Sequence, residues 1–290
     1  MYAVTGVTGQ VGGAVARALI AGGQSIRVIV RDPGKAQEWA AQGAEIAVAN
    51  FSDRASLAEA FDGTDGVYAM LPANFAPDPN FTEARAIILA LRQALESTKT
   101  NKVCFLSSVG AQHDHGLGLI TQLYLLEQEM RSLLLPTAFV RPGWFMENSN
   151  WDIPVVRASQ QLPAFLQPLD RAFPMVATED IGRAIANVLQ QEWSGNRVVE
   201  IEGPKRYSQN DLAEIFGSLM GTQVQANAVP RDQWAAQFEA QGAAPNVLGP
   251  RIEMLDGFNS GWIDFEGQGA EHIVGKRTME EVLTAALSKS

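Results

Sequence analysis

The feature that most constrains this chain is a glycine-rich segment close to its first residue, Thr5 to Gly13 (TGVTGQVGG). It follows a short apolar run, Tyr2 to Val4, and precedes an alanine-rich helical pattern that ends near Ala21. The order is therefore strand, glycine turn, helix. Such a turn lets the backbone approach a pyrophosphate and directs the N–H groups of a helix N-terminus towards it. Because both flanking elements are the ones this mechanism requires, the segment predicts a dinucleotide-binding turn.

Strand-type runs alternate with helical patterns through the first half of the chain. The strand-type runs are residues 2–4, 26–30, 45–48, 66–71, 102–106 and 137–140, and the helical patterns are 10–21, 34–42, 53–61, 81–97 and 119–133. This alternation indicates right-handed crossovers between parallel strands. We therefore predict an α/β chain with a Rossmann-type, doubly wound parallel sheet.

The alternation ends at Trp144. Residues 149–175 contain Pro154, Pro163, Pro168 and Pro174 and show little periodicity, so we expect an irregular segment there. Regular patterns return with a helix over 179–190 capped by Thr178, a strand over 197–201, and less distinct helices over 231–241 and 246–259.

These patterns predict two interleaved parts. Residues 1–150 form the nucleotide-binding domain, to which a helix and strand from about 176–201 return. Residues 151–290 form a smaller, partly irregular lid on the substrate side. Since ligands of doubly wound sheets bind at the carboxyl ends of the strands, we expect the cleft between the two parts.

Composition excludes several classes of partner. The net charge of −10 disfavours nucleic acid. The single cysteine, Cys104, excludes an intrachain disulfide, and no apolar run is long enough for a membrane span. The first residues already form the first strand, so we expect no signal peptide and a cytoplasmic protein. No further cluster of metal-ligating residues accompanies His113 and His115, so no metal site is predicted. The sequence leaves the oligomeric state open.

The end of the second strand bears on the choice of dinucleotide. In this architecture an acid at that position binds the free ribose hydroxyls, whereas a base pairs with a 2′-phosphate. Arg31 ends the strand and Lys35 follows it, which favours NADP(H) over NAD(H). Two alternatives stay open: Asp32 could turn inwards to a ribose, or both cations could simply be solvated.

Several segments together resemble the NmrA-like branch of the atypical short-chain dehydrogenases/reductases. They are the glycine turn, Val30 to Pro33, Ser107 to Ala111, Arg141 to Asn148, and the stretches 179–182 and 202–212. This group includes NADPH:quinone reductases, isoflavone-reductase-like enzymes and catalytically silent NADPH sensors. The resemblance covers almost the whole chain and implies two sets of site residues. Those expected at the cofactor are Gly6, Thr8, Gly9, Gln10, Val11, Gly12, Arg31, Lys35, Asn50, Phe51, Met70, Leu71, Pro72 and Ser107, and those on the substrate side are Trp144, Glu147 and Asn148.

The chain departs from the short-chain dehydrogenase pattern at the proton-transfer residues. These enzymes usually carry Tyr-x-x-x-Lys on the helix after the fifth strand, where the phenol passes a proton to the substrate oxygen. An ungapped alignment back from Arg141 places Leu119 and Leu123 at the two positions. Tyr124 is the candidate catalytic residue that remains on this helix, although it could equally pack on a half-buried face. His113, in the loop after the fifth strand, is a second candidate on the substrate side.

Two functions follow from the resemblance. The first is NADPH-dependent reduction of a quinone or a similar conjugated small molecule, for which a missing Tyr–Lys pair is tolerable because solvent can supply the proton. The second is a catalytically silent, NADP(H)-sensing regulatory protein. A sugar-nucleotide epimerase or dehydratase would need the tyrosine and is disfavoured.

Overall fold

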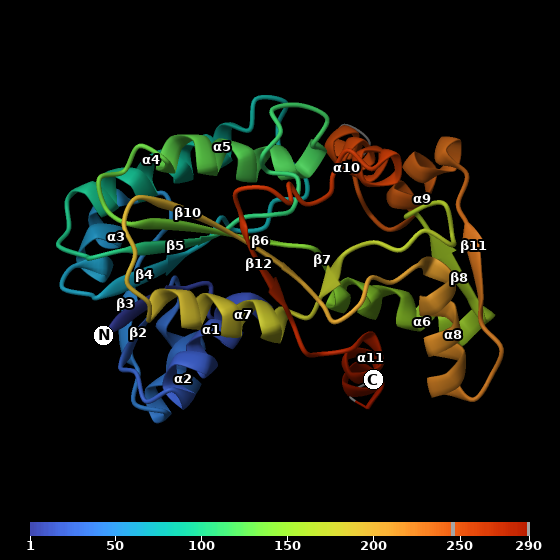
Figure 1. Cartoon of the computed structure of the whole chain (residues 1–290), viewed down its shortest axis with the longest axis horizontal. Helices are drawn as coiled ribbons and strands as arrows, with labels where there is room; N and C mark the ends of the chain where they lie inside the picture. The colour runs from blue at the N-terminus through green and yellow to red at the C-terminus, as the bar shows by residue number, and fades with distance from the viewer. Residues whose placement is uncertain (245–246, 289–290) are drawn as a thin grey trace.

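The computed structural model describes residues 1–244 and 247–288, and its centre is a parallel sheet (Figure 1). Within the described residues the sheet has eight strands in the order β12-β10-β6-β5-β4-β1-β2-β3. They are β1 (Tyr2–Thr5), β2 (Ile26–Val30), β3 (Glu45–Val48), β4 (Gly66–Ala69), β5 (Val103–Leu106), β6 (Thr137–Pro142), β10 (Asn196–Glu202) and β12 (Glu271–Val274). The first six strands have the Rossmann order 3-2-1-4-5-6. The predicted fold class is confirmed.

Helices cover both faces of this sheet (Figure 1). One face packs against α1 (Gln10–Ala21) and α7 (Thr178–Leu189), and the other against α3 (Arg54–Phe61), α4 (Thr82–Glu96) and α5 (Thr121–Met130). The helix predicted over 34–42 is split into a 3-10 turn, Pro33–Ala36, and the short α2 (Gln37–Ala41). Helices α1 and α7 can approach closely because Gly182 has no side chain. A Cβ at this position would lie only 2.4 Å from the Cβ of Ala14.

Apart from α7, β10 and β12, the chain that follows β6 forms a separate group of elements beyond the ends of the strands (Figure 1). Its two small sheets pair β7 (Trp144–Phe145) with β9 (Met175–Val176) and β8 (Gln161–Ala164) with β11 (Gln225–Ala228). Its helices are α6 (Ile153–Ser159), α8 (Gln209–Met220), α9 (Trp234–Ala240), α10 (Leu248–Ser260) and α11 (Met279–Leu287), with 3-10 turns at Met146–Asp152 and Arg231–Gln233. We call these elements the lid.

The expectation of an irregular segment over 149–175 was wrong in part. That stretch contains the end of a 3-10 turn, all of α6 and β8, and the first residue of β9. Pro154 stands in the first turn of α6, where a missing N–H costs nothing, and Pro163 lies in a two-stranded sheet, which has only edge strands. The helix predicted from 246 corresponds to α10, but residue 246 lies outside the described residues.

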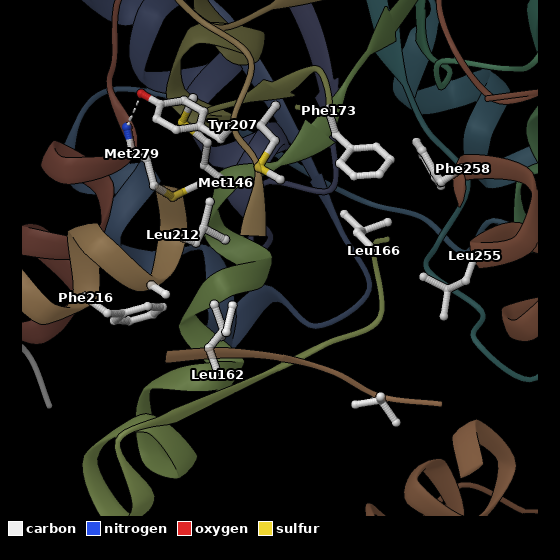
Figure 2. Packing of buried hydrophobic residues seen from close by; sticks show 14 of the residues in the cluster. Met146, Leu162, Leu166, Phe173, Tyr207, Leu212, Phe216, Leu255, Phe258 and Met279 are labelled. Atoms are coloured by element: carbon white, nitrogen blue, oxygen red, sulfur yellow. Dashed lines mark hydrogen bonds between the residues drawn. The ribbon is translucent and has the colours of Figure 1, made fainter. Parts of the chain in front are cut away.

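The lid has its own hydrophobic core (Figure 2). Tyr207 is fully buried there, and its hydroxyl accepts a hydrogen bond of 2.9 Å from the backbone N–H of Met279. Leu162 and Phe216 pack into the same cluster from β8 and α8. Among the described helices, none is both long and apolar enough to cross a membrane.

Candidate functional site

The glycine turn between β1 and α1 leaves no room for a side chain at two of its positions, residues 6 and 12. Gly6 has a φ of +64°, and a Cβ there would lie 2.6 Å from the Sδ atom of Met70. A Cβ at Gly12 would lie 2.2 Å from the carbonyl oxygen of Gly6. Glycine is therefore required at both positions, first for the left-handed backbone and then for close packing of the helix on the turn.

The N-terminus of α1 is open at this turn. The helix begins at Gln10, its N-cap residue Gly9 provides no side-chain hydrogen bond, and its first turn contains no acid. Thr8, Gly9 and Gln10 are exposed, whereas Val11 is buried. Uncapped N–H groups and the positive end of the helix dipole attract an anion. The turn therefore fits the pyrophosphate of a dinucleotide.

Two free cations flank the end of β2. Arg31 and Lys35 are exposed, and neither forms an ion pair with any described residue. The carboxylate of Asp32 instead accepts a 2.9 Å hydrogen bond from the backbone N–H of Gly34 and caps the following 3-10 turn. Past β3, Asn50 accepts a hydrogen bond from the N–H of Ser52, and Phe51 is half-buried.

A cavity of about 960 Å³ lies at the carboxyl ends of β4, β5 and β6. One wall comes from the sheet and the other from the lid elements α6, β8, α9 and α10. It adjoins the glycine turn because Met70, which contacts Gly6, is one of its lining residues. The cavity brings together these residues singled out in the sequence: Met70, Leu71, Pro72, Ser107, Trp144 and Asn148.

A buried ionic cluster fixes Ser107 at the edge of this cavity. The Ser107 hydroxyl donates a 2.6 Å hydrogen bond to Oε1 of Glu127, and Arg141 donates to both oxygens of that carboxylate at 2.8 and 2.7 Å. All three residues are buried. Because the hydroxyl hydrogen is directed at Glu127, Ser107 can only accept hydrogen bonds from a ligand in the cavity.

The two positions that the ungapped alignment assigned to the Tyr-x-x-x-Lys pair lie on the cavity wall as apolar side chains. Leu119 and Leu123 both line the cavity, and no tyrosine, lysine or histidine is found among the lining residues of the described chain. Tyr124 does not line it: its ring is half-buried against the lid core. The structure thus separates the candidate Tyr124 from the cavity.

Two residues expected on the substrate side lie elsewhere. The ring of His113 stacks on Trp262, with 3.9 Å between centroids, and does not line the cavity. The carboxylate of Glu147 also lies outside it and accepts hydrogen bonds from the N–H of Thr178 at 2.9 Å and from its hydroxyl at 2.7 Å. Burial raises the pKa of Glu147.

The same contacts correct the predicted cap of α7. The N-cap residue is Ala177, not Thr178, because Glu147 reaches across from the chain after β7 and takes the hydrogen bonds that Thr178 donates. Glu147 therefore ties the lid to α7, and its carboxylate does not line the cavity.

The cavity also contains two ionisable residues that the sequence did not single out, Asp152 and Arg251. Burial raises the pKa of Asp152 to about 7, and its carboxyl group has no hydrogen-bond or ion-pair partner among the described residues. A carboxyl group with a pKa near neutrality can donate or accept a proton under physiological conditions. Asp152 follows Asn148 by four residues in the same 3-10 turn, where the sequence predicted irregular chain.

These features define a class before any comparison. A parallel sheet in Rossmann order, a glycine turn under an open helix N-terminus and a cavity at the strand ends are typical of dinucleotide-binding proteins. The model of the NmrA-like family matches residues 2–253, and the chain belongs to this family.

Curated relatives and solved structures are similar over most of the chain. An NAD(P)H azoreductase from Xenophilus azovorans is 25% identical over 255 residues, 88% of this chain and 86% of its own. Quinone oxidoreductase 2 of Escherichia coli (strain K12) is 23% identical over 283 residues, 96% and 95% of the two chains. The NADPH-complexed structure of an Escherichia coli quinone oxidoreductase has a TM-score of 0.79 at 22% identity, with 99% and 100% of the chains covered. The structure of triphenylmethane reductase from Citrobacter sp. complexed with NADP(H) has a TM-score of 0.80 at 20% identity, and the match covers 98% of this chain and 99% of that one.

Proposed function

We propose that this protein binds NADP(H) and uses it to reduce a quinone or a similar conjugated small molecule. The observation that carries the proposal is the cavity of about 960 Å³, which joins the strand ends beside the glycine turn to an apolar lid. A flat apolar acceptor held there lies next to the site that the turn prepares for a dinucleotide. The azoreductase and the quinone oxidoreductases among the relatives support the same reaction type.

The cations after β2 support NADP(H) over NAD(H). Arg31 offers a planar fork suited to a phosphate, and Lys35 adds a point charge. The competing acid, Asp32, is engaged with the backbone of its own turn. The lone cysteine, Cys104, is a buried free thiol, which supports a reducing compartment, and we propose the cytoplasm.

The residues around the cavity suggest how the reaction proceeds. A bound nicotinamide supplies a hydride, and the reduced acceptor also takes up a proton. Because Ser107 donates its hydroxyl hydrogen to Glu127, it can accept a hydrogen bond from a ligand and so orient the ligand without donating to it. Asp152 is the ionisable group on the wall that can supply the proton, and apolar side chains such as Leu119 and Leu123 exclude water.

The test is oxidation of NADPH in the presence of a panel of quinones, enones and azo compounds, followed by near-ultraviolet absorbance. We expect acceptor-dependent oxidation well above the background of the protein alone. If no acceptor gives turnover, the reductase proposal is refuted.

The leucines at positions 119 and 123 favour a second candidate, an NADP(H)-sensing protein. It predicts cofactor binding without turnover, together with an NADPH-dependent change in oligomeric state on size exclusion. An unchanged elution profile with and without NADPH would exclude the sensor.

A further inference from the structure

Arg251, in the first turn of α10, is a partly buried cation without a counter-ion. It lines the cavity, and its guanidinium carbon lies 3.7 Å from the ring centroid of Phe238, which is fully buried. No carboxylate of the described residues forms an ion pair with it, and burial lowers its pKa without an opposing contribution. An arginine remains charged at neutral pH even so.

Most other arginines that are at least partly buried have acidic partners, and Arg171, which lacks one among the described residues, donates a 2.8 Å hydrogen bond to the backbone carbonyl of Asn259. Arg141 pairs with Glu127 and Glu266, at 2.7 and 3.0 Å. Arg231, also in the lid, lies over the ring of Trp234 as Arg251 lies over Phe238, but it is largely exposed and pairs with Asp256 at 2.6 Å. Withdrawing a guanidinium from water without a partner is unfavourable. No described residue neutralises the charge of Arg251, so an anionic ligand is the partner that this site favours.

The surroundings of Arg251 suit an anion held at its edge. Stacking on Phe238 covers one face of the guanidinium, and its in-plane N–H groups can bind two oxygens side by side. The other lining residues of α9, its C-cap and α10 are neutral: Gln237, Gln241, Met254, Leu255 and Phe258. The other ionisable lining residue, Asp152, does not pair with Arg251.

We propose that Arg251 forms an anion subsite at the lid end of the cavity, so that the preferred ligands are flat aromatic compounds carrying a carboxylate or sulfonate. The apolar body of such a compound fits against Trp144 and Phe258, whose rings meet edge to face at 5.3 Å. In a chain with a net charge of −10, a cation inside the cavity also offsets the repulsion that an acidic ligand meets on approach. That these ligands are reduced rests on the proposed function; that they bind does not.

The alternative is that Arg251 only supports the lid by packing on Phe238. The two hypotheses differ in the predicted effect of an Arg251 substitution on the affinity for a neutral ligand. A packing role affects all ligands equally, whereas an anion subsite affects acidic ligands alone. The informative quantity is therefore the ratio of affinities for an acidic ligand and its neutral isostere.

The experiment uses naphthoate and its methyl ester, neither of which has to be reduced to give a signal. Binding to the full-length protein is measured by titration calorimetry, with NADP⁺ present in one series and absent in the other. We expect the wild type to prefer naphthoate, and Arg251→Met to reduce that preference by about ten- to a hundredfold, the range for hydrogen bonds to a charged group. Arg251→Lys, which keeps the charge but loses the fork, should retain part of it.

Arg231→Gln is the matched control, since it removes a stacked lid arginine outside the cavity and should leave the preference unchanged. The proposal is overturned if the wild type binds the ester as well as the acid, if naphthoate does not bind, or if Arg251→Met weakens both ligands equally. Failure of the reductase proposal gives a different result: naphthoate binds through Arg251, but naphthoquinone and its sulfonate are not reduced.

Discussion

The two sides of the cavity are built in different ways. The cofactor side is a local structure, in which β1, the glycine turn and α1 follow one another within residues 2–21. The substrate side is assembled from distant segments: β8 pairs with β11, and α9 and α10 complete the wall. The turn acts through backbone groups and the absence of side chains, whereas the lid acts through the side chains it presents.

This difference predicts that each side can be damaged separately. A change in the turn should remove cofactor binding and leave the lid core intact. A change in the lid core should lower stability and acceptor turnover more than it lowers affinity for the cofactor. The following substitutions test that separation.

The largest effect is expected for Gly12→Ala. The new Cβ would meet the carbonyl oxygen of Gly6 at 2.2 Å, and because this atom is backbone, α1 must move away from the turn. We expect NADPH affinity, measured by fluorescence titration, to fall by about a thousandfold or more, roughly 4 kcal/mol.

Gly249→Ala is the control for the Gly12 substitution. Gly249 lies in α10, and a Cβ there meets nothing within 4 Å. Replacing a helical glycine by alanine should leave NADPH binding unchanged and stabilise the fold by about 0.5–1 kcal/mol. Equal NADPH affinity in the Gly12 and Gly249 variants would show that the turn does not hold the cofactor.

Leu162→Ala tests the lid. Leu162 is fully buried in β8 and packs into the lid core (Figure 2). Its truncation should reduce the free energy of unfolding by about 3 kcal/mol, measured by urea denaturation. Leu134→Ala, at a fully exposed leucine, should have almost no effect. If NADPH affinity falls as much as acceptor turnover in the Leu162 variant, the two sides are not separable.

The sequence predicted the cofactor side of the fold well because its signals are local. The first six strands were predicted in order because the residues that follow each strand favour a turn. The strand–turn–helix pattern likewise explains why residues 6 and 12 are glycine. The eighth strand, β12, was missed. It is a short edge strand of mostly exposed residues, so its sequence lacks the apolar alternation of a strand.

The substrate side was harder to predict because its residues act through partners far away in the sequence. Trp144 and Asn148 line the cavity, and their role on the substrate side stays a prediction. Glu147, their neighbour, instead binds Thr178, a contact that no periodicity reveals. Asp152 and Arg251 became visible only when the folded lid placed them in one cavity.

A smaller effect than those of Gly12 and Leu162 is expected for Arg31→Ala. Arg31 is exposed and without an acidic partner among the described residues, so its loss should not affect stability. We expect NADPH affinity to fall by about tenfold to a hundredfold, the size of a hydrogen-bonded contact to a charged group, while NADH affinity stays nearly constant. Equal losses for the two cofactors would refute the preference for NADP(H).

The smallest effect is expected for Asp152→Asn, which tests a residue on the lid side of the cavity. Burial raises the pKa of Asp152 from 3.8 to about 7, so the carboxyl group holds its proton below that pH and can donate it. Acceptor turnover should therefore decline as the pH rises through about 7, and the variant should be about tenfold slower below pH 7, since solvent partly replaces the donor.

The same proton affects stability, which gives this variant a second readout. The folded protein retains the Asp152 proton at pH values where the unfolded chain has lost it, so the wild type loses free energy of unfolding as the pH rises from about 4 to about 7. The asparagine variant lacks this dependence because it has no proton to release. If kcat and melting temperature follow the same pH profiles in the wild type and the Asp152→Asn variant, Asp152 neither donates the proton nor has a raised pKa. The lid then contributes the shape of the cavity but no proton donor.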